Sequence, residues 1–206
     1  EAGAMPLGPE WLHRGVCSPF WRLFYDFSPG AWVACAGRSY ELNSSHLVIM
    51  PDGVPFDCGG RMGVEHVWLH FSLHLIMPAA APGILWLDAG PDVQAVAAAL
   101  RRAIEAREKA TARHLGLALL HVAFARLDEG WFKTPGRRLS RVLTWLEHNA
   151  AGEVTNAKLA AQAGLGVEAF IRWFKESTGR TPAAFVAEWR VREACRRLAY
   201  GEDSIE

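Results

Sequence analysis

Residues 156–179, NAKLAAQAGLGVEAFIRWFKESTG, predict two short helices joined by a turn. Apolar residues recur at helical spacing up to Ala163, and Gly164 then interrupts the pattern. A second periodic run follows, with Phe170, Trp173 and Phe174 on one face. Two helices joined by a glycine-containing turn are typical of the helix-turn-helix, whose second helix can enter the major groove of DNA. An ordinary helical hairpin would give the same pattern, so this stretch alone leaves both interpretations open.

The flanking residues extend the helical region in both directions. Downstream, Gly179 ends the second helix and Pro182 stands in the first turn of a third, where proline is tolerated. Upstream, a core stripe at helical spacing predicts a scaffold helix over residues 139–150, and it consists of Leu139, Val142, Leu143 and Leu146. We therefore expect an all-α domain in this part of the chain.

The order of these elements resembles the DNA-binding domain of the AraC/XylS family of bacterial transcription regulators over about residues 137–206. The matching residues are Leu159-Ala160, Ala163-Gly164-Leu165, Phe170, Phe174-Lys175, Thr178-Gly179, Pro182, Phe185-Val186, Arg190-Val191, Ala194 and Leu198. Gly166 departs from the family pattern, which has serine or a similar N-cap there. Members of this family carry a second helix-turn-helix unit, and Ser204-Ile205 looks like its opening. We therefore expect a truncated or partly ordered C-terminus, and weak DNA binding by these residues alone.

The outward face of the second helix is the predicted DNA-reading surface. The resemblance implies that Glu168, Ile171 and Arg172 face base edges, and Arg172 can make a bidentate contact to guanine. Lys175 lies one turn further on, where we expect it to meet phosphate. The alternative is an ordinary solvated, charged helix face.

Composition agrees with a DNA-binding protein without identifying one. The chain has 206 residues and a formal net charge of zero. Residues 137–206 carry a small excess of basic side chains, which weakly favours a phosphate-binding face. The four cysteines form no CxxC pair, which argues against a zinc finger and for a reducing cytoplasm. Apolar stretches are interrupted by charges or prolines and no secretory signal is visible, so we expect a cytoplasmic protein without a membrane span.

The N-terminal half has a β-rich pattern. From about residue 14 to residue 88, short stretches rich in Val, Ile, Phe and Trp alternate with turn residues, which predicts an all-β barrel or sandwich. The runs at 47–55 and 66–71 look like the effector-binding domain of the same family, a cupin-like β-barrel.

One predicted strand, residues 65–75 (EHVWLHFSLHL), has an unusual face. Alternation places on it the four candidate effector-binding residues His66, Trp68, His70 and His74. Three interpretations remain open: a pocket in which Trp68 stacks on an effector and histidines hydrogen-bond to it, a metal site, and a solvated face or satisfied structural histidines. A metal site is disfavoured because His66 and His70 are separated by roughly 13 Å of strand rise. Flat aromatic walls would suit a sugar-like or aromatic effector.

Two helical patterns follow, at residues 92–108 and 112–127. The second is apolar over a wide arc, more than one contact surface needs. It can pack on the barrel or form a homodimer, and we expect a dimer with Leu115, Leu119 and Val122 in the interface.

The sequence therefore predicts an α+β protein with an N-terminal cupin-like β-barrel, following helices and an all-α helix-turn-helix domain. The expected segments are 1–90 (barrel), 91–130 (dimerisation helices), 131–138 (linker) and 139–206 (DNA binding). The predicted function is a ligand-responsive regulator that binds double-stranded DNA, without a cofactor, a metal or an enzymatic activity. The alternative is a small cupin-type metalloenzyme with a helical appendage.

Overall fold

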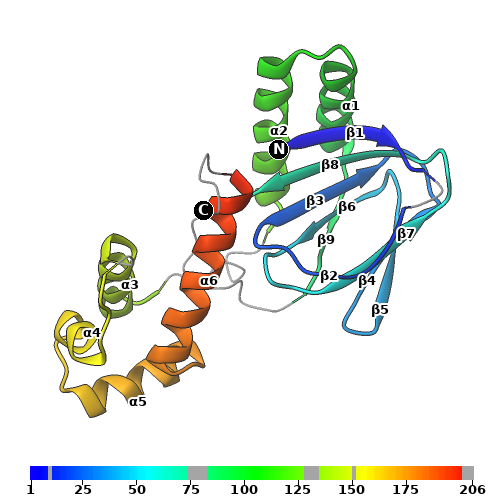
Figure 1. Cartoon of the computed structure of the whole chain (residues 1–206). Coiled ribbons are helices and arrows are strands. Elements are labelled where there is room, and N and C mark those ends of the chain that lie inside the picture. The colour runs from blue at the N-terminus through cyan, green and yellow to red at the C-terminus, as the bar shows by residue number, and fades with distance from the viewer. Residues whose placement is uncertain (9–10, 74–82, 128–134, 150–151, 201–206) are drawn as a thin grey trace. The chain divides into compact units, whose positions relative to one another are not determined.

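The computed structural model describes residues 1–8, 11–73, 83–127, 135–149 and 152–200. Its chain divides into two compact units (Figure 1). Unit 1 contains the described residues up to 127, and unit 2 contains those from 135 onward. The whole is a mixed α+β structure, with sheets in the N-terminal part and helices in the C-terminal part. Within the described ranges, no helix is both long enough and apolar enough to cross a membrane.

Unit 1 holds two antiparallel sheets. One has the strand order β1-β8-β3-β6-β9 and the other has the order β2-β7-β4-β5. The strands are β1 (Ala2–Pro6), β2 (Leu12–Val16), β3 (Trp21–Asp26), β4 (Ala31–Cys35), β5 (Arg38–Leu42), β6 (His46–Met50), β7 (Phe56–Gly60), β8 (Glu65–Phe71) and β9 (Leu85–Asp88). Among the described residues no ladder joins the two sheets, so the expected cupin-like barrel is not closed. The strands of unit 1 form two separate open sheets instead.

Local turn chemistry explains part of this arrangement. The β4–β5 hairpin turns at Ala36 and Gly37, which have φ values of 50° and 77°. Two consecutive positive φ values match the tight turn whose twist suits adjacent antiparallel strands. Glycine adopts such values freely, whereas alanine does so at a cost.

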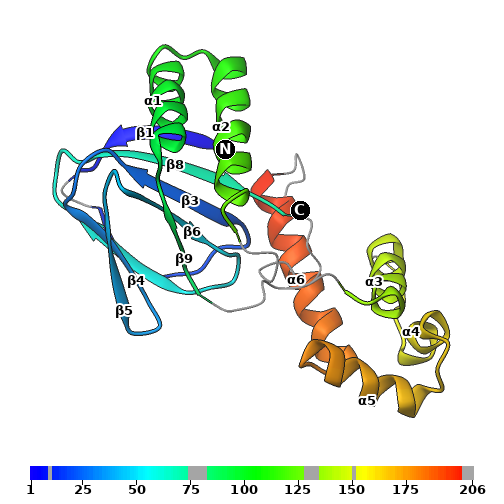
Figure 2. The ribbon, with the colours of Figure 1, turned by 180° about the vertical axis from the view of Figure 1, so that it is seen from behind.

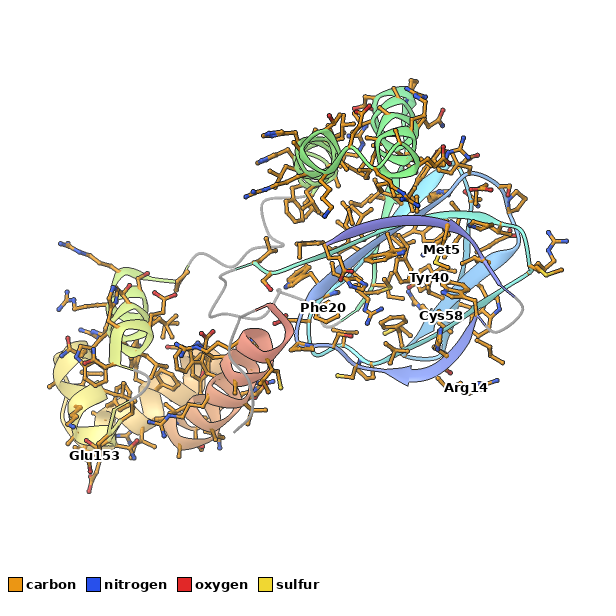
Figure 3. All side chains as sticks on the ribbon, turned by 45° about the horizontal axis from the view of Figure 1, so that its top comes forward. Met5, Arg14, Phe20, Tyr40, Cys58 and Glu153 are labelled. Atoms are coloured by element: carbon orange, nitrogen blue, oxygen red, sulfur yellow. The ribbon has the colours of Figure 1, made fainter. Side chains whose placement is uncertain are left out.

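A buried core lies between the two sheets. Phe24 of β3 and Val48 of β6 meet Val33 of β4 and Phe56 of β7 there, and all four are almost fully buried. Trp68 and Trp86 pack at the edge of this cluster. Figure 3 shows Tyr40 and Cys58 in the same region and Arg14 pointing outward from β2.

Two helices, α1 (Pro91–Glu105) and α2 (Lys109–Phe124), lie beside β1 and β8 (Figures 1 and 2). The Phe124 ring is 5.9 Å from that of Phe71, and Gly116 lets α2 approach Leu69 closely. Arg126 reaches back to Asp92 at 2.5 Å and joins the end of α2 to the start of α1. The helices therefore cover the side of β8 that carries Leu69 and Phe71.

Unit 2 consists, as far as it is described, of α3 (Arg137–Asn149), α4 (Asn156–Ala163), α5 (Val167–Thr178) and α6 (Pro182–Tyr200). The four stripe residues predicted for the scaffold helix are all buried in one cluster with residues of α4, α5 and α6. The Phe174 ring of α5 meets Phe170 and Phe185 at 5.3 Å each. The predicted scaffold stripe is therefore confirmed.

Candidate functional site

The helix pair α4–α5 is built by local capping. The Thr155 side chain accepts a hydrogen bond from the Lys158 amide and begins α4. Gly164 ends α4 in the left-handed conformation, with φ 65° and ψ 40°. Gly166 begins α5 without a side-chain cap, as its departure from the family pattern predicts. These turns allow α5 to follow α4 after three residues, Gly164, Leu165 and Gly166.

One face of α5 is buried and the other is open. Phe170 and Phe174 are 0% and 1% exposed, which confirms that they point inward. Glu168, Arg172 and Lys175 are exposed, and none of the described ion pairs engages Arg172 or Lys175. These three residues therefore present one carboxylate and two cations to solvent, and the exposed Glu176 adds a second carboxylate beside Arg172.

Contrary to the prediction from the sequence for the DNA-reading face, Ile171 does not point fully outward. It is half-buried and packs against the core cluster of unit 2. It follows Phe170 directly and lies three residues before Phe174, so it stands at the border of the buried arc. Only part of its side chain is available to a partner.

A second candidate site lies on the face of β3 and β8 that points between the sheets. The register places Arg22 opposite His70, Phe24 opposite Trp68 and Asp26 opposite His66. Side chains directly opposite each other in antiparallel strands share one face of the sheet. We call these six residues the interior face.

At one end of the interior face, His66 and Asp26 form a buried pair. They are 2% and 0% exposed, and His66 Nδ1 lies 2.6 Å from Asp26 Oδ1. Burial raises the pKa of the Asp26 carboxyl, and the hydrogen bond with His66 offsets part of that rise. The second oxygen, Asp26 Oδ2, is buried and has no hydrogen-bond partner among the described residues. The pair therefore leaves one acceptor available inside the unit.

At the other end, His70 lies among aromatic rings and beside Arg22. Its ring is 4.5 Å from Trp68 and 4.6 Å from Phe20. Burial, followed by the charge of Arg22, lowers the pKa of His70 to about 4. His70 is therefore neutral at neutral pH, and its 3.8 Å approach to the Glu1 carboxylate is not an ion pair there. A neutral imidazole can both donate and accept a hydrogen bond.

The structure brings together three of the four predicted effector-binding residues. His66, Trp68 and His70 share the interior face, whereas His74 lies outside the described residues. His66 is not solvated, because it is 2% exposed and hydrogen-bonded to Asp26, which agrees with the interpretation as a satisfied structural histidine. Within the described residues, no group of three His, Cys, Asp or Glu side chains could hold a metal ion.

Sequence reasoning missed Asp26 and Arg22. Both alternate with Phe24 in WRLFYD, the sequence of β3, and charged residues in so apolar a strand were an available signal. The pattern gave no information on which strand would lie opposite. Their pairing with His66 and His70 depends on the β3–β8 register alone.

The predicted dimer residues on α2 fall into two groups. Leu115 and Val122 are half-buried, but Leu119 is 0% exposed. The assignment of Leu119 to a dimer surface is therefore wrong. It belongs to the core of unit 1, on the buried stripe of α2 that also contains Ala112, Gly116 and Ala123.

No family model matches the chain. A stretch of 85 residues, 39% of the chain, is 35% identical to the HTH-type transcriptional activator RhaS of Pectobacterium atrosepticum. Another of 80 residues, 38% of the chain, is 34% identical to RhaS of Mannheimia succiniciproducens. These matches span only 30% and 29% of the two relatives.

Solved structures of ToxT from Vibrio cholerae have a similar fold. An apo variant aligns with a TM-score of 0.56 over 98% of this chain and 84% of its own length, at 9% identity. The wild-type protein bound to an unsaturated fatty acid aligns with a TM-score of 0.56 over 98% of this chain and 81% of its own, at 8% identity. At such low identity the likeness concerns the fold alone.

Proposed function

We propose that this chain, which belongs to the AraC/XylS family of transcription regulators, binds double-stranded DNA sequence-specifically through the helix pair α4–α5. The observation that carries this proposal is the open face of α5. Arg172 and Lys175 are exposed there, while the opposite face is fixed in the core by Phe170 and Phe174. A helix held rigidly on one side with free cations on the other suits insertion into a major groove.

Each exposed residue of α5 has a distinct role in this proposal. Arg172 donates two hydrogen bonds to a guanine edge, and Glu168 accepts one from a cytosine amino group. Lys175 contacts phosphate, which positions the helix without reading sequence. Ile171, half-buried as it is, can touch only a thymine methyl group.

The interior face of unit 1 is proposed as the effector site. The free oxygen Asp26 Oδ2 and the neutral ring of His70 supply hydrogen-bonding groups, and Trp68 supplies a flat apolar wall. A small molecule with hydroxyl groups and an apolar or aromatic face matches this set. The fatty acid bound to ToxT supports a ligand-responsive role for the same fold.

A homodimer in the cytoplasm completes the proposal. Leu115 and Val122 lie seven residues apart on α2, and so on one stripe of the helix, and both are half-buried in a single chain. Two-fold association is the commonest assembly of soluble proteins. Light scattering of a Val122→Arg variant should show a folded monomer. If the variant is still a folded dimer, the interface does not include this face of α2.

The decisive experiment measures sequence preference. A preferred DNA site is first selected from random sequence with the wild-type chain. Arg172→Ala should then lose about 1–3 kcal/mol of discrimination against a changed guanine. Lys175→Gln should weaken all sequences about equally, and Arg141→Ala, which removes an exposed arginine of α3, should leave discrimination unchanged. Full discrimination by Arg172→Ala would show that α5 does not read bases.

A further inference from the structure

An open groove in unit 1 belongs to neither proposed site. It is a largely apolar pocket of about 650 Å³ between strands β1 and β8 and helices α1 and α2. Its apolar walls include Leu69 and Phe71 of β8, Ile104 of α1, and Leu117 and Leu120 of α2. Leu117 is 47% exposed. Leu69 and Phe71 alternate with the residues of the interior face, and only His70 borders both places.

Cations border this groove where α1 passes into α2. Arg107, Lys109 and Arg113 line it, together with the carboxylates of Glu1 and Glu108. The described ion pairs include none of the three cations. An apolar wall with available cations at its border is complementary to a molecule that joins an apolar chain to an anionic group.

The local backbone adds to this preference for an anion. The first turn of α2 contains no acidic residue, and its N-cap Glu108 makes no side-chain capping bond. The positive end of the helix dipole lies beside Lys109, and the carboxylate of Glu108 at the N-cap offsets part of it. Arg107 has φ 60°, an unusual value for a residue with a side chain.

We propose that this groove binds an amphipathic carboxylate. Its alkyl chain lies against Leu69, Leu117 and Leu120, and its carboxylate lies beside Arg107 and Arg113. The groove is separate from the DNA-reading helix, and its failure to bind would leave the proposed function unchanged.

A series of three ligands with one chain length tests the proposal. Decanoate, 1-decanol and decyltrimethylammonium are titrated calorimetrically into the 206-residue chain, the two ions below their critical micelle concentrations and the alcohol below its solubility limit. Decanoate should bind about tenfold more tightly than decanol, because only it gains charge-assisted contacts. Decyltrimethylammonium should bind most weakly. Equal affinities, or no binding of decanoate, would overturn the proposal.

Variants locate the binding within the groove. Arg107→Gly removes a cation where the positive φ favours glycine, so it should fold normally while weakening decanoate about threefold to tenfold and leaving decanol unchanged. Arg113→Gln should act in the same way. Arg102→Gln is the matched control, since Arg102 is exposed on α1 but does not line the groove.

If Arg102→Gln weakens decanoate binding as much as Arg107→Gly does, the effect comes from the overall charge of the chain and not from the groove, and the proposed site is wrong. Leu117→Asn should weaken all three ligands, because it alters the apolar wall. If Leu117→Asn instead halves the mass in light scattering and decanoate does not bind to the wild-type chain, the groove is covered by a second copy and the proposal is wrong.

Discussion

At the scale of single residues, His70 makes the stability of unit 1 depend on pH. The pKa of His70 is about 4 in the folded chain, whereas an ordinary histidine, as in the unfolded chain, has a pKa of 6.5. The unfolded chain therefore binds the proton more readily. The stability that the neutral His70 ring contributes to the folded state is therefore fully present above about pH 6.5, and it is lost as the pH falls toward 4. Urea unfolding should show a loss of about 2 kcal/mol between pH 7.5 and pH 5.

The variant His70→Gln isolates this contribution. It keeps polarity and approximate volume but cannot titrate, so its stability should change little over the same interval. Asp26 acts with the opposite sign, because its raised pKa means that its contribution falls as the pH rises through that pKa. If His70→Gln keeps the pH dependence of the wild-type chain, another group is responsible.

Gly3 is a residue that must be glycine because its backbone lies in close contact with Trp68. A Cβ atom at this position would lie 2.3 Å from Cζ2 of Trp68, so the indole needs the bare backbone of β1. Gly3→Ala should cost about 1–3 kcal/mol of unfolding free energy and change the near-ultraviolet circular dichroism of the tryptophans. Gly8→Ala is the control, since a Cβ there meets nothing within 4 Å. Equal stability of the two variants would mean that Trp68 does not rest on β1.

At the scale of elements, helix α2 has one buried and one open side. Leu119 is 0% exposed and Leu117 is 47% exposed. Leu119→Ala should therefore lower the unfolding free energy by about 2–5 kcal/mol. Leu117→Ala, the matched control, should cost well under half of that. Similar costs in urea titrations would show that α2 is rotated about its axis relative to this structure.

At the scale of the whole molecule, charge does not attract DNA over a distance. The net charge is zero, so the proposed DNA binding must depend on local cations such as Arg172 and Lys175. With about five phosphate contacts, affinity should fall roughly 10²–10³-fold between 50 and 200 mM salt. Lys175→Gln should reduce the slope of log affinity against log salt by about one. A slope near zero would rule out phosphate-based docking.

The sequence by itself determined the helices of unit 2 and the direction of their buried faces. The αL glycine at 164, the caps around it and the stripe from Leu139 to Leu146 act within a few residues of each other. Such local preferences can be read without a partner. For the same reason, the strand of residues 65–71 and its two alternating faces were predictable.

Tertiary structure alone decided what each face meets. Alternation placed His66 and His70 on one side of β8, but only the register with β3 joined them to Asp26 and Arg22. Helical periodicity put Leu117 and Leu119 on the same helix without telling which one is buried. It also left Ile171 at the border of the buried face of α5. The two sheets also stay open, contrary to the expected barrel. All of these outcomes depend on contacts between residues distant in the chain, and a pattern of local spacing carries no information about such contacts.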